Sequence, residues 1–414
     1  MRLLEYRYRP IHAACEKVFG LLAPMLPAVQ GRPLSKPPRQ VLVLKFGGMG
    51  EAVLARSLIE QLRRRNPSVT FDFLVEERTA ETMTCSGGRS PLVYRSGADG
   101  VKRALELLRQ IRRRRYGAVL DFEQRSLLTA GFMRVTSIPV RVGFVSPEPD
   151  PRRRLLTHSV ELREGEPMWN AFTRLGRVLD PQLPEQLMTV PLPVSAEMDL
   201  WMEKWWSANV GSDPESRTVA MHLGVGPSAQ YRRWPVERFV ELAERLRSGR
   251  EDLTVILTGD SSERHLIRDF AQRFRGKSID ASNLGGLERT AALLRRCGLL
   301  ISCDTGIMHL GAAMGISTVG LFGPNTPACW APVGPRATYV YATRLSCSPC
   351  INSYRRLIPQ TCIAPTYGAC MSDIGVHEVL RAARAVVGDD WLGPAESVAT
   401  IGEQSNFKMT QARG

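Results

Sequence analysis

The sequence lacks long apolar runs: no stretch of its 414 residues approaches the ~18 residues that a helix needs to span a bilayer. Nine cysteines are too few for a disulfide scaffold in a chain of this length. Met1–Gln40 lacks the continuous apolar segment and small-residue cleavage site of a signal peptide. These absences exclude a multi-span membrane protein and a disulfide-rich secreted domain, and they predict a cytoplasmic protein.

The chain also has too few acidic residues to balance its basic ones. It carries 55 Lys and Arg against 41 Asp and Glu, a formal net charge of +14. Residues 1–160 hold 28 basic and 14 acidic residues, whereas residues 161–414 hold 27 of each. A region this basic favours an anionic partner, unless the charge serves only solubility. Nucleic acid is the poorer choice of partner, because no aromatic platforms interleave with the basic residues.

Apolar strands alternate with glycine-rich loops and helices along most of the chain, which predicts an α/β protein with parallel sheets. Residues 41–193 and 194–396 are predicted to be two such domains, with the boundary in a proline-rich stretch. Residues 1–40 form a basic amphipathic extension and linker, which predicts either a membrane-surface segment or a helix packed on the first domain. Residues 397–414 carry no core pattern, so we expect a flexible tail.

The first motif is the loop that follows the predicted strand Val41–Leu44. It reads Lys45-Phe-Gly-Gly-Met-Gly-Glu51, and its glycines let a ligand approach the backbone at the start of the next helix. The loop has neither the dinucleotide-binding G-x-G-x-x-G nor the Gly-Lys-Ser/Thr of a Walker loop. Glu51 is predicted to lie in the first helical turn, either as a catalytic carboxylate or as an acid favoured by the helix dipole.

A second motif follows the predicted strand Thr218–Leu223. The segment Gly224–Pro235 contains small residues, the hydroxyl of Ser228 and the guanidinium of Arg232. Arginine beside free backbone N–H groups suits a diphosphate. We therefore interpret this segment as a phosphate-binding loop, with a merely exposed basic loop as the alternative.

A third motif, Asp304-Thr305-Gly306, stands between a predicted strand and a helix of small residues that contains His309. The backbone amides at such a helix start bind anions. Asp304 either turns toward a sugar hydroxyl or caps the helix. His309 is either a packed core residue or part of the same site.

These motifs together resemble glycosyltransferase family 9, the ADP-heptose:lipopolysaccharide heptosyltransferases. The resemblance rests on Asp304–Gly315, Val319–Pro324 and Trp330–Pro332, with Lys45–Leu54 similar to the family's opening motif and Arg232–Pro235 to its central one. It implies a GT-B fold, in which two Rossmann-like domains with parallel sheets face a central cleft. It also implies inverting transfer of a heptose from ADP-heptose, with no cofactor or metal required for catalysis.

The resemblance further implies a role for each matching residue. Glu51 stands where the family has the Asp that acts as catalytic base, and Gly47 and Gly48 stand where Ser is common. The acceptor side then consists of Lys45, Gly47, Gly48, Met49 and Gly50. The donor nucleotide-sugar side consists of Gly226, Ser228, Arg232, Glu263, Asp304, Thr305, Gly306 and His309, with Ser228 and Arg232 at the phosphates and Glu263 at the ribose.

Four cysteines cluster late in the chain: Cys347, Cys350, Cys362 and Cys370. A C-x2-C pair with two more thiols nearby has the composition of a tetrahedral zinc or iron site. A related group of autotransporter heptosyltransferases uses such a cluster for iron. We therefore expect a structural Zn or Fe here, with unmetallated reduced thiols as the alternative.

The resemblance thus implies an inverting glycosyltransferase that moves a heptose or similar sugar to a lipopolysaccharide-core-type or other anionic glycan. The basic N-terminal part favours an anionic glycolipid acceptor and peripheral association with the inner face of the cytoplasmic membrane. Two alternatives stay open at this point. One is a non-catalytic nucleotide-sugar-binding or scaffold protein, and the other is a heptosyltransferase with a protein acceptor.

Overall fold

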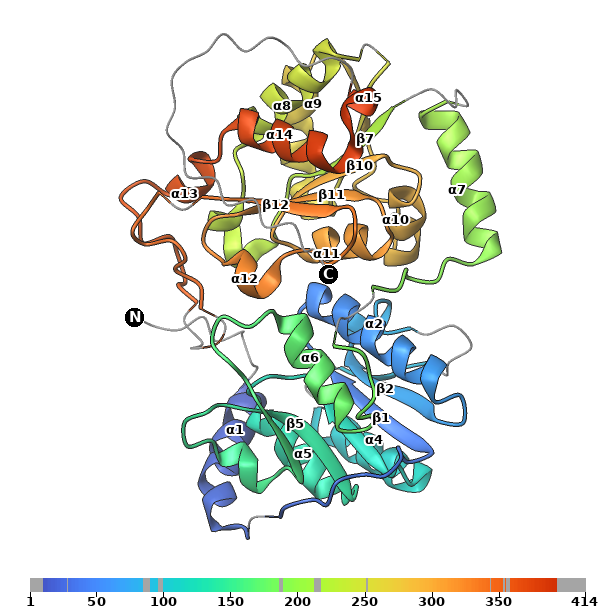
Figure 1. The fold of residues 1–414 in the computed structure, drawn as a ribbon, viewed down its shortest axis with the longest axis vertical. Helices are drawn as coiled ribbons and strands as arrows, with labels where there is room; N and C mark the ends of the chain where they lie inside the picture. Colours follow the sequence, from blue (N-terminus) through green and yellow to red (C-terminus); the bar gives the residue numbers. More distant parts are fainter. Residues whose placement is uncertain are drawn as a thin grey trace. The chain divides into compact units, whose positions relative to one another are not determined.

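A computed structural model describes residues 10–392 except 28, 85–89, 96–99, 186–188, 212–216, 251, 343, 353 and 355–357. The chain divides into two compact units, with the change from the first to the second between Pro193 and Val194. A short return around Tyr354 belongs to the first unit. Each unit is built on one parallel sheet (Figure 1).

The sheet of the first unit has the strand order β3-β2-β1-β4-β5-β6. Its core strands are continuous apolar runs, as expected for a parallel sheet covered on both faces. The order reverses between β1 and β4, and ligands bind at the carboxyl ends of strands at such a switch point. The strands are β1 (Gln40–Lys45), β2 (Thr70–Glu76), β3 (Leu92–Tyr94), β4 (Ala118–Asp121), β5 (Val140–Val145) and β6 (His158–Glu161).

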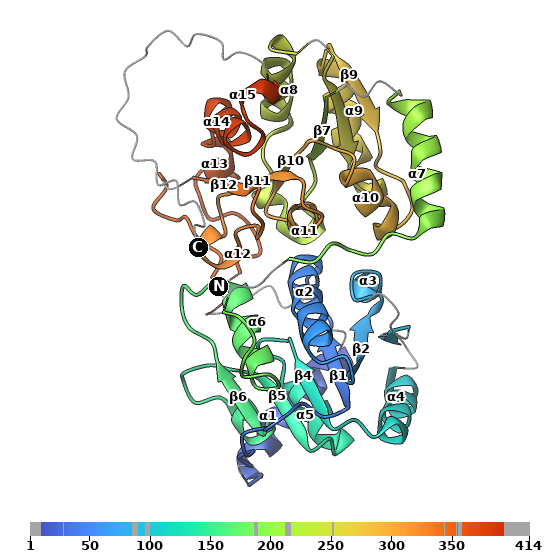
Figure 2. The same cartoon turned by 45° about the vertical axis from the view of Figure 1, so that its right-hand side comes forward.

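Two helical layers cover this sheet (Figure 2). On one face, Ala23, Leu107, Ile111, Ala130 and Met133 share a core with alternate residues of β1 and β4. These residues come from η1 (Ala23–Met25), α4 (Gly100–Arg114) and α5 (Leu127–Thr136). The other face carries α2 (Met49–Arg65) and α6 (Met168–Arg177), which pack on each other. The remaining elements are α1 (Pro10–Leu22), α3 (Glu77–Ala80) and η2 (Pro151–Arg154).

The second unit repeats this plan, with the strand order β12-β11-β10-β7-β8-β9 and a switch point between β7 and β10. Its strands are β7 (Thr218–His222), β8 (Thr254–Thr258), β9 (Lys277–Asp280), β10 (Leu299–Cys303), β11 (Ser317–Phe322) and β12 (Ala337–Tyr341). Its helices are α7 (Ala196–Asn209), η3 (Pro227–Arg232), α8 (Val236–Ser248), η4 (Ser261–Glu263), α9 (Arg264–Arg273), α10 (Leu287–Leu294), α11 (Gly306–Ala313), α12 (Pro327–Trp330), α13 (Ala369–Ser372), α14 (Val376–Val387) and α15 (Asp389–Leu392).

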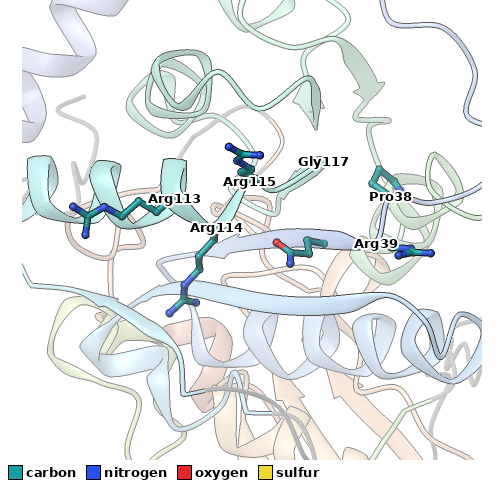
Figure 3. Close-up of a pocket in the computed structure, with 7 residues that line it drawn as sticks. Pro38, Arg39, Arg113, Arg114, Arg115 and Gly117 are labelled. Carbon is teal, nitrogen blue, oxygen red and sulfur yellow. The ribbon is translucent and has the colours of Figure 1, made fainter.

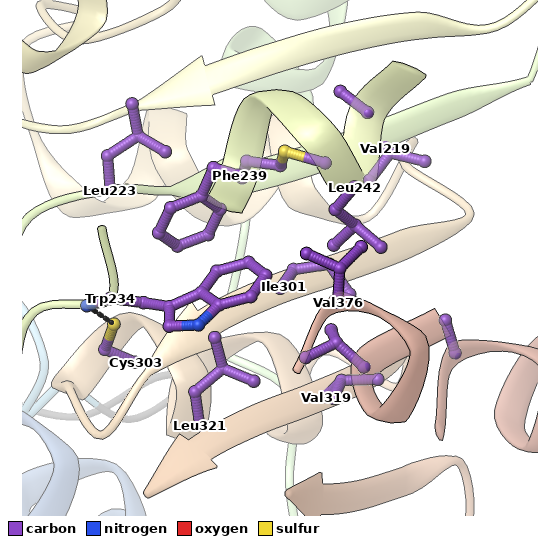
Figure 4. Close-up of a cluster of buried hydrophobic side chains, with 14 of the residues drawn as sticks. Val219, Leu223, Trp234, Phe239, Leu242, Ile301, Cys303, Val319, Leu321 and Val376 are labelled. Carbon is purple, nitrogen blue, oxygen red and sulfur yellow. Dashed lines mark hydrogen bonds between the residues drawn. The ribbon is translucent and has the colours of Figure 1, made fainter. Parts of the chain in front are cut away.

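Trp234, near the end of the predicted phosphate-binding loop, anchors the core of this unit (Figure 4). Its ring is fully buried and meets Phe239 edge to face, with ring centroids 4.7 Å apart. The indole N–H donates to the Ile374 carbonyl, and the Trp234 backbone N–H donates to Cys303 Sγ at 3.3 Å. Burial and hydrogen bonding of this ring fix the backbone that carries Arg232.

The N-terminal extension contains a helix that packs on the first unit. Phe19 of α1 lies against Gly131 of α5, and a Cβ at Gly131 would lie 2.4 Å from that ring. The Glu16 carboxylate accepts hydrogen bonds from the Leu127 and Leu128 backbone N–H groups and from Ser126 Oγ at the start of α5. This helix is therefore held by an apolar contact with α5 and by hydrogen bonds to the start of α5. The predicted tail, residues 397–414, lies outside the described residues.

None of the helices between residues 10 and 392 that the structure describes combines the length and the apolar character needed to cross a bilayer.

Candidate functional site

The carboxyl edge of the first sheet assembles one lysine and two glutamates. Lys45 ends β1, and its Nζ lies 2.6 Å from Glu51 Oε2 and 2.6 Å from Glu123 Oε1. Glu51 lies in the first turn of α2, as predicted, and Glu123 follows β4. The ammonium is buried, whereas the Glu51 side chain keeps one quarter of its surface exposed. One cation thus bridges two carboxylates at the switch point of the sheet.

Glu123 also holds the glycine-rich loop in place. Its Oε1 accepts hydrogen bonds from the backbone N–H groups of Phe46 and Gly47, at 2.8 and 3.2 Å. The next residue, Gly48, has a φ of +68°, which favours glycine, and a Cβ there would lie 3.1 Å from Glu51 Cδ. The loop of Lys45, Gly47, Gly48, Met49 and Gly50 therefore wraps around the carboxylates, and Met49 and Gly50 begin α2.

The two carboxylates differ in their electrostatic environment. Burial raises the pKa of Glu51 above its ordinary value, and the charge of Glu123 adds to this effect, although Lys45 opposes both. Burial also acts on Glu123, but Lys45 and the loop N–H groups outweigh it and lower the pKa of Glu123. For Lys45, burial opposes the charge, yet the two glutamates hold its pKa above the ordinary value. Glu51 is thus the carboxylate that more readily takes up a proton.

A buried ion pair supports this site from behind. Asp121 ends β4, and its carboxylate accepts hydrogen bonds from Arg152 Nη2 at 2.8 Å, Thr129 Oγ1 at 2.7 Å and the Glu123 backbone N–H at 2.9 Å. Burial raises the pKa of Asp121 to about 6, with Arg152 opposing. The Arg152 side chain is only 1% exposed. It therefore neutralises an internal acid and supplies no surface charge.

In the second unit, Glu263 fills a space that exists because residue 224 is glycine. A Cβ on Gly224 would lie 1.5 Å from Glu263 Oε1. The carboxylate accepts a hydrogen bond from the Asp260 backbone N–H in a capping box at the start of η4. His222 lies nearby, and burial lowers its pKa, although the charge of Glu263 opposes this. Glu263 thus lies at the carboxyl ends of β7 and β8, where the sheet places ligands.

Arg232 reaches the end of β10. Its Nη1 lies 3.2 Å from Asp304 Oδ2, and the same oxygen accepts a hydrogen bond from Asn325 Nδ2 at 2.8 Å. Asp304 therefore faces Arg232, and the alternative that it caps the helix is wrong, because the N-cap residue of α11 is Thr305. The Arg232 side chain is 28% exposed, so its guanidinium lies at the surface of this edge.

The start of α11 follows at once. The Thr305 hydroxyl lies 3.0 Å from Ser302 Oγ. It therefore does not cap the first N–H groups of α11. His309 is buried on this helix, and burial lowers its pKa to about 4, with Asp304 opposing. The imidazole is therefore neutral at pH 7. Its ring meets Trp330 edge to face.

Two predicted donor-site residues lie in the preceding loop. Gly226 has a φ of +65° and stands at the N-terminus of η3. The backbone of Ser228 lies within η3, but its side chain lies outside the described part of the chain. The structure thus brings Glu263, Arg232, Asp304 and the start of α11 to one sheet edge, while the contacts of the Ser228 hydroxyl stay a prediction.

The predicted metal centre is not supported. All four cysteines of the cluster are free thiols, and burial raises the pKa of Cys370 to about 11. Over the described ranges, no group of three or more His, Cys, Asp or Glu side chains is placed to hold a metal ion. Instead, Cys362 Sγ accepts a hydrogen bond from the Gly368 backbone N–H, and the Cys370 Sγ packs close to Gly323. Two of these thiols, Cys362 and Cys370, therefore have local hydrogen-bonding or packing partners in place of a metal.

Two residues of these sites were not predicted from the sequence. Glu123 is bound to a loop 78 positions away in the chain, and Asn325 to an acid 21 positions away. The only local signal for Glu123 was its place just beyond the end of a buried strand. Asn325 similarly follows β11.

The two parallel six-stranded sheets, each with charged groups at its carboxyl edge, give the chain the GT-B fold, which it shares with solved heptosyltransferase structures. A family model described as glycosyltransferase family 9 (heptosyltransferase) matches residues 104–359. The chain therefore belongs to glycosyltransferase family 9, and it is a glycosyltransferase enzyme. The matched range begins after the loop of Lys45 and Glu51.

Curated relatives and solved structures agree with this assignment. The chain is 24% identical over 322 residues to lipopolysaccharide heptosyltransferase 2 of Escherichia coli, covering 73% of this chain and 87% of that protein. It is 25% identical over 326 residues to lipopolysaccharide heptosyltransferase 1 of Pseudomonas aeruginosa, covering 76% and 86%. A family 9 glycosyl transferase from Veillonella parvula has the same fold, with a TM-score of 0.69, 18% identity and coverage of 86% and 99%.

Proposed function

We propose that this enzyme transfers a heptose from ADP-heptose to a hydroxyl of a lipopolysaccharide-core-type or similar anionic glycolipid, with inversion. The single observation that carries the proposal is the Lys45 ammonium bridging Glu51 and Glu123 at the switch point of the first sheet. Curated relatives named as lipopolysaccharide heptosyltransferases, over most of their length, support the choice of sugar and acceptor.

In this mechanism Glu51 is the general base. It accepts the proton of the acceptor hydroxyl as the oxygen attacks the anomeric carbon of the donor. The raised pKa of Glu51 suits this role, because a base works best when its pKa approaches the operating pH. Glu123 keeps Lys45 and the loop N–H groups in position and stays ionised itself, so the proton goes to Glu51.

The second unit binds the donor and stabilises the departing nucleoside diphosphate. Negative charge builds on the diphosphate as the glycosidic bond breaks, and fixed N–H groups and cations lower the barrier. Arg232, partly exposed beside Asp304, supplies the cation, and the N–H groups of Thr305 and Gly306 supply hydrogen bonds. Glu263 accepts hydrogen bonds from the ribose hydroxyls. These groups provide the stabilisation that the reaction needs without a metal.

The test is a transfer assay with ADP-heptose and heptose-free lipopolysaccharide core, followed by mass spectrometry of the product. Before it, a thermal-shift screen of ADP-, UDP-, GDP- and CMP-linked sugars identifies the donor, and we expect stabilisation by the ADP-linked sugar. Binding of ADP-heptose without transfer to any glycan or protein acceptor would instead identify a non-catalytic binding protein. Transfer from a different nucleotide-sugar would overturn the donor assignment alone.

A further inference from the structure

The outer face of α1 is an exposed apolar ridge. Val18, Leu21, Leu22 and Met25 are 50%, 75%, 49% and 80% exposed. Their spacing places Val18, Leu21 and Leu22 on one side of α1, and Met25 follows in η1, whereas Glu16 and Phe19 face α5. Such a helix has a second apolar surface, and covering this surface with an apolar partner would lower the free energy.

The ridge is part of a larger surface. The outer face of the helical layer formed by α1, α4 and α5 also exposes Leu105 and Val135. Of the ten large apolar side chains that are exposed in the described part of the chain, six belong to these three elements and η1. Exposed apolar groups are thus concentrated on one face of the first unit rather than scattered, as they are on an ordinary surface.

The same layer carries the densest positive charge. Helix α4 contains six Lys or Arg residues and one acidic residue, Glu106. Lys102, Arg103, Arg109 and Arg113 are exposed on it. The C-terminal end of α4 contacts the end of α5, because Arg112 Nη2 donates to the Val135 carbonyl at 2.7 Å. Next to the ridge, Arg154 Nη1 donates to the Leu26 carbonyl.

This charge does not form a site for one small anion. A pocket of about 460 Å³ is lined by Arg39, Arg113, Arg114 and Arg115, but their guanidinium groups point in different directions (Figure 3). Arg114 is already paired with Asp72 at 2.9 Å. A spread of separate positive charges suits a surface of many anionic groups better than a single phosphate.

We propose that the layer of α1, α4 and α5 docks on an anionic lipid membrane, with the α1 ridge inserted at the headgroup boundary and α4 in contact with the anionic headgroups. Apolar insertion and electrostatic attraction together are the two signals that give a stable peripheral association. The inference deepens the proposed function, since it brings the enzyme to its glycolipid. It does not depend on catalysis, because lipid binding needs no sugar donor.

The test is flotation of the full-length protein with vesicles of phosphatidylcholine alone or with added phosphatidylglycerol, in the absence of any nucleotide-sugar. We expect binding to the anionic vesicles, and weaker binding to the zwitterionic ones. The double substitution Leu21→Glu/Met25→Glu should lower binding to both at least ~10-fold. Lys102→Glu/Arg109→Glu should lower binding to the anionic vesicles at least ~10-fold and abolish the preference for them.

Matched controls lie in the second unit. Leu200→Glu changes a leucine of α7 that is 55% exposed, and Arg264→Glu/Arg268→Glu reverses two charges on α9. Both should bind vesicles like the wild type. Every variant should keep the thermal midpoint of the wild type and its stabilisation by the donor nucleotide.

Three results would overturn the proposal: no flotation of the wild type, equal loss in the α7 or α9 controls, or a wild-type dimer that Leu21→Glu/Met25→Glu converts to a monomer without a change in flotation. The last result would identify the ridge as a contact between two copies of the chain. Flotation without sugar transfer would leave the docking surface standing and contradict the proposed function alone.

Discussion

The pairing of Lys45 with two carboxylates predicts how the pH dependence of the reaction responds to Glu123→Gln. Each carboxylate oxygen lies 2.6 Å from Nζ, so the two oxygens are at most about 5 Å apart. At an effective dielectric constant of about 20, two like charges at this distance repel by about 3 kcal/mol. Partial exposure of Glu51 reduces that figure. The repulsion raises the pKa of Glu51, and Glu123→Gln removes it.

The direction of the effect follows from the role of the base. Glu51 must be ionised to accept a proton, so the rate falls as the pH drops below the pKa of Glu51. In the Glu123→Gln enzyme that pKa decreases, both because a neighbouring negative charge is gone and because Lys45 then serves Glu51 alone. We expect the acidic limb of the kcat profile to move to lower pH. The plateau should fall by about tenfold, because a weaker base accepts the proton less readily.

The assay is the rate of nucleotide release across a pH series at saturating donor and acceptor. Glu51→Gln should lower kcat at least ~100-fold across the whole pH series, with no acidic limb left to shift. Glu77→Gln, an exposed glutamate in the same unit, serves as the control and should leave the profile unchanged. Near-normal turnover of Glu51→Gln, or an acidic limb that stays in place in Glu123→Gln, would refute this reasoning.

Three further substitutions test the second unit and the support behind Glu123. Arg232→Ala should weaken donor binding by about 10- to 100-fold in calorimetry, the loss expected for a charge-assisted hydrogen bond, and an unchanged affinity would contradict its role. Gly224→Ala should weaken donor binding too, because its Cβ displaces Glu263. Arg152→Ala should cost about 3–5 kcal/mol of stability in urea unfolding, by leaving Asp121 buried without its cation. In the wild type, the pKa of Asp121 is about 6 when folded against an ordinary 3.8, so its contribution to stability should decrease as the pH rises through that window.

Buried strands were the part of the fold that the sequence predicted best. The predicted strands Val41–Leu44 and Thr218–Leu223 match β1 (Gln40–Lys45) and β7 (Thr218–His222) to within one residue at each end, because a strand covered on both faces is a short, continuous apolar run. Glycine loops after these runs then indicated which edge of each sheet carries the functional groups. Glu51 could be assigned to the first turn of α2 on this local pattern alone.

Side-chain partners could not be predicted in the same way. Glu123 and Asn325 are single polar residues beyond strand ends, and their partners are set by which strands neighbour each other. Arg152 and Arg153 both count toward the basic excess of residues 1–160, but Arg152 is buried against Asp121 and Arg153 pairs with Glu161. Charge counted along a sequence does not distinguish an internal counter-ion from a docking surface, since burial is decided by tertiary packing.

Each sheet edge pairs a cation with a carboxylate, but the two pairs differ in how deeply the cation is buried. This difference in burial separates the two proposed roles. Lys45 is 1% exposed between two carboxylates, so it is fixed and acts on Glu51 through its charge. Arg232 is 28% exposed, and its contact with Asp304 is the longer one, 3.2 Å. A partly exposed guanidinium retains further N–H groups for a phosphate while Asp304, itself bound by Asn325, holds one side of it. We therefore infer that the first edge sets the basicity of a carboxylate and that the second receives an anion.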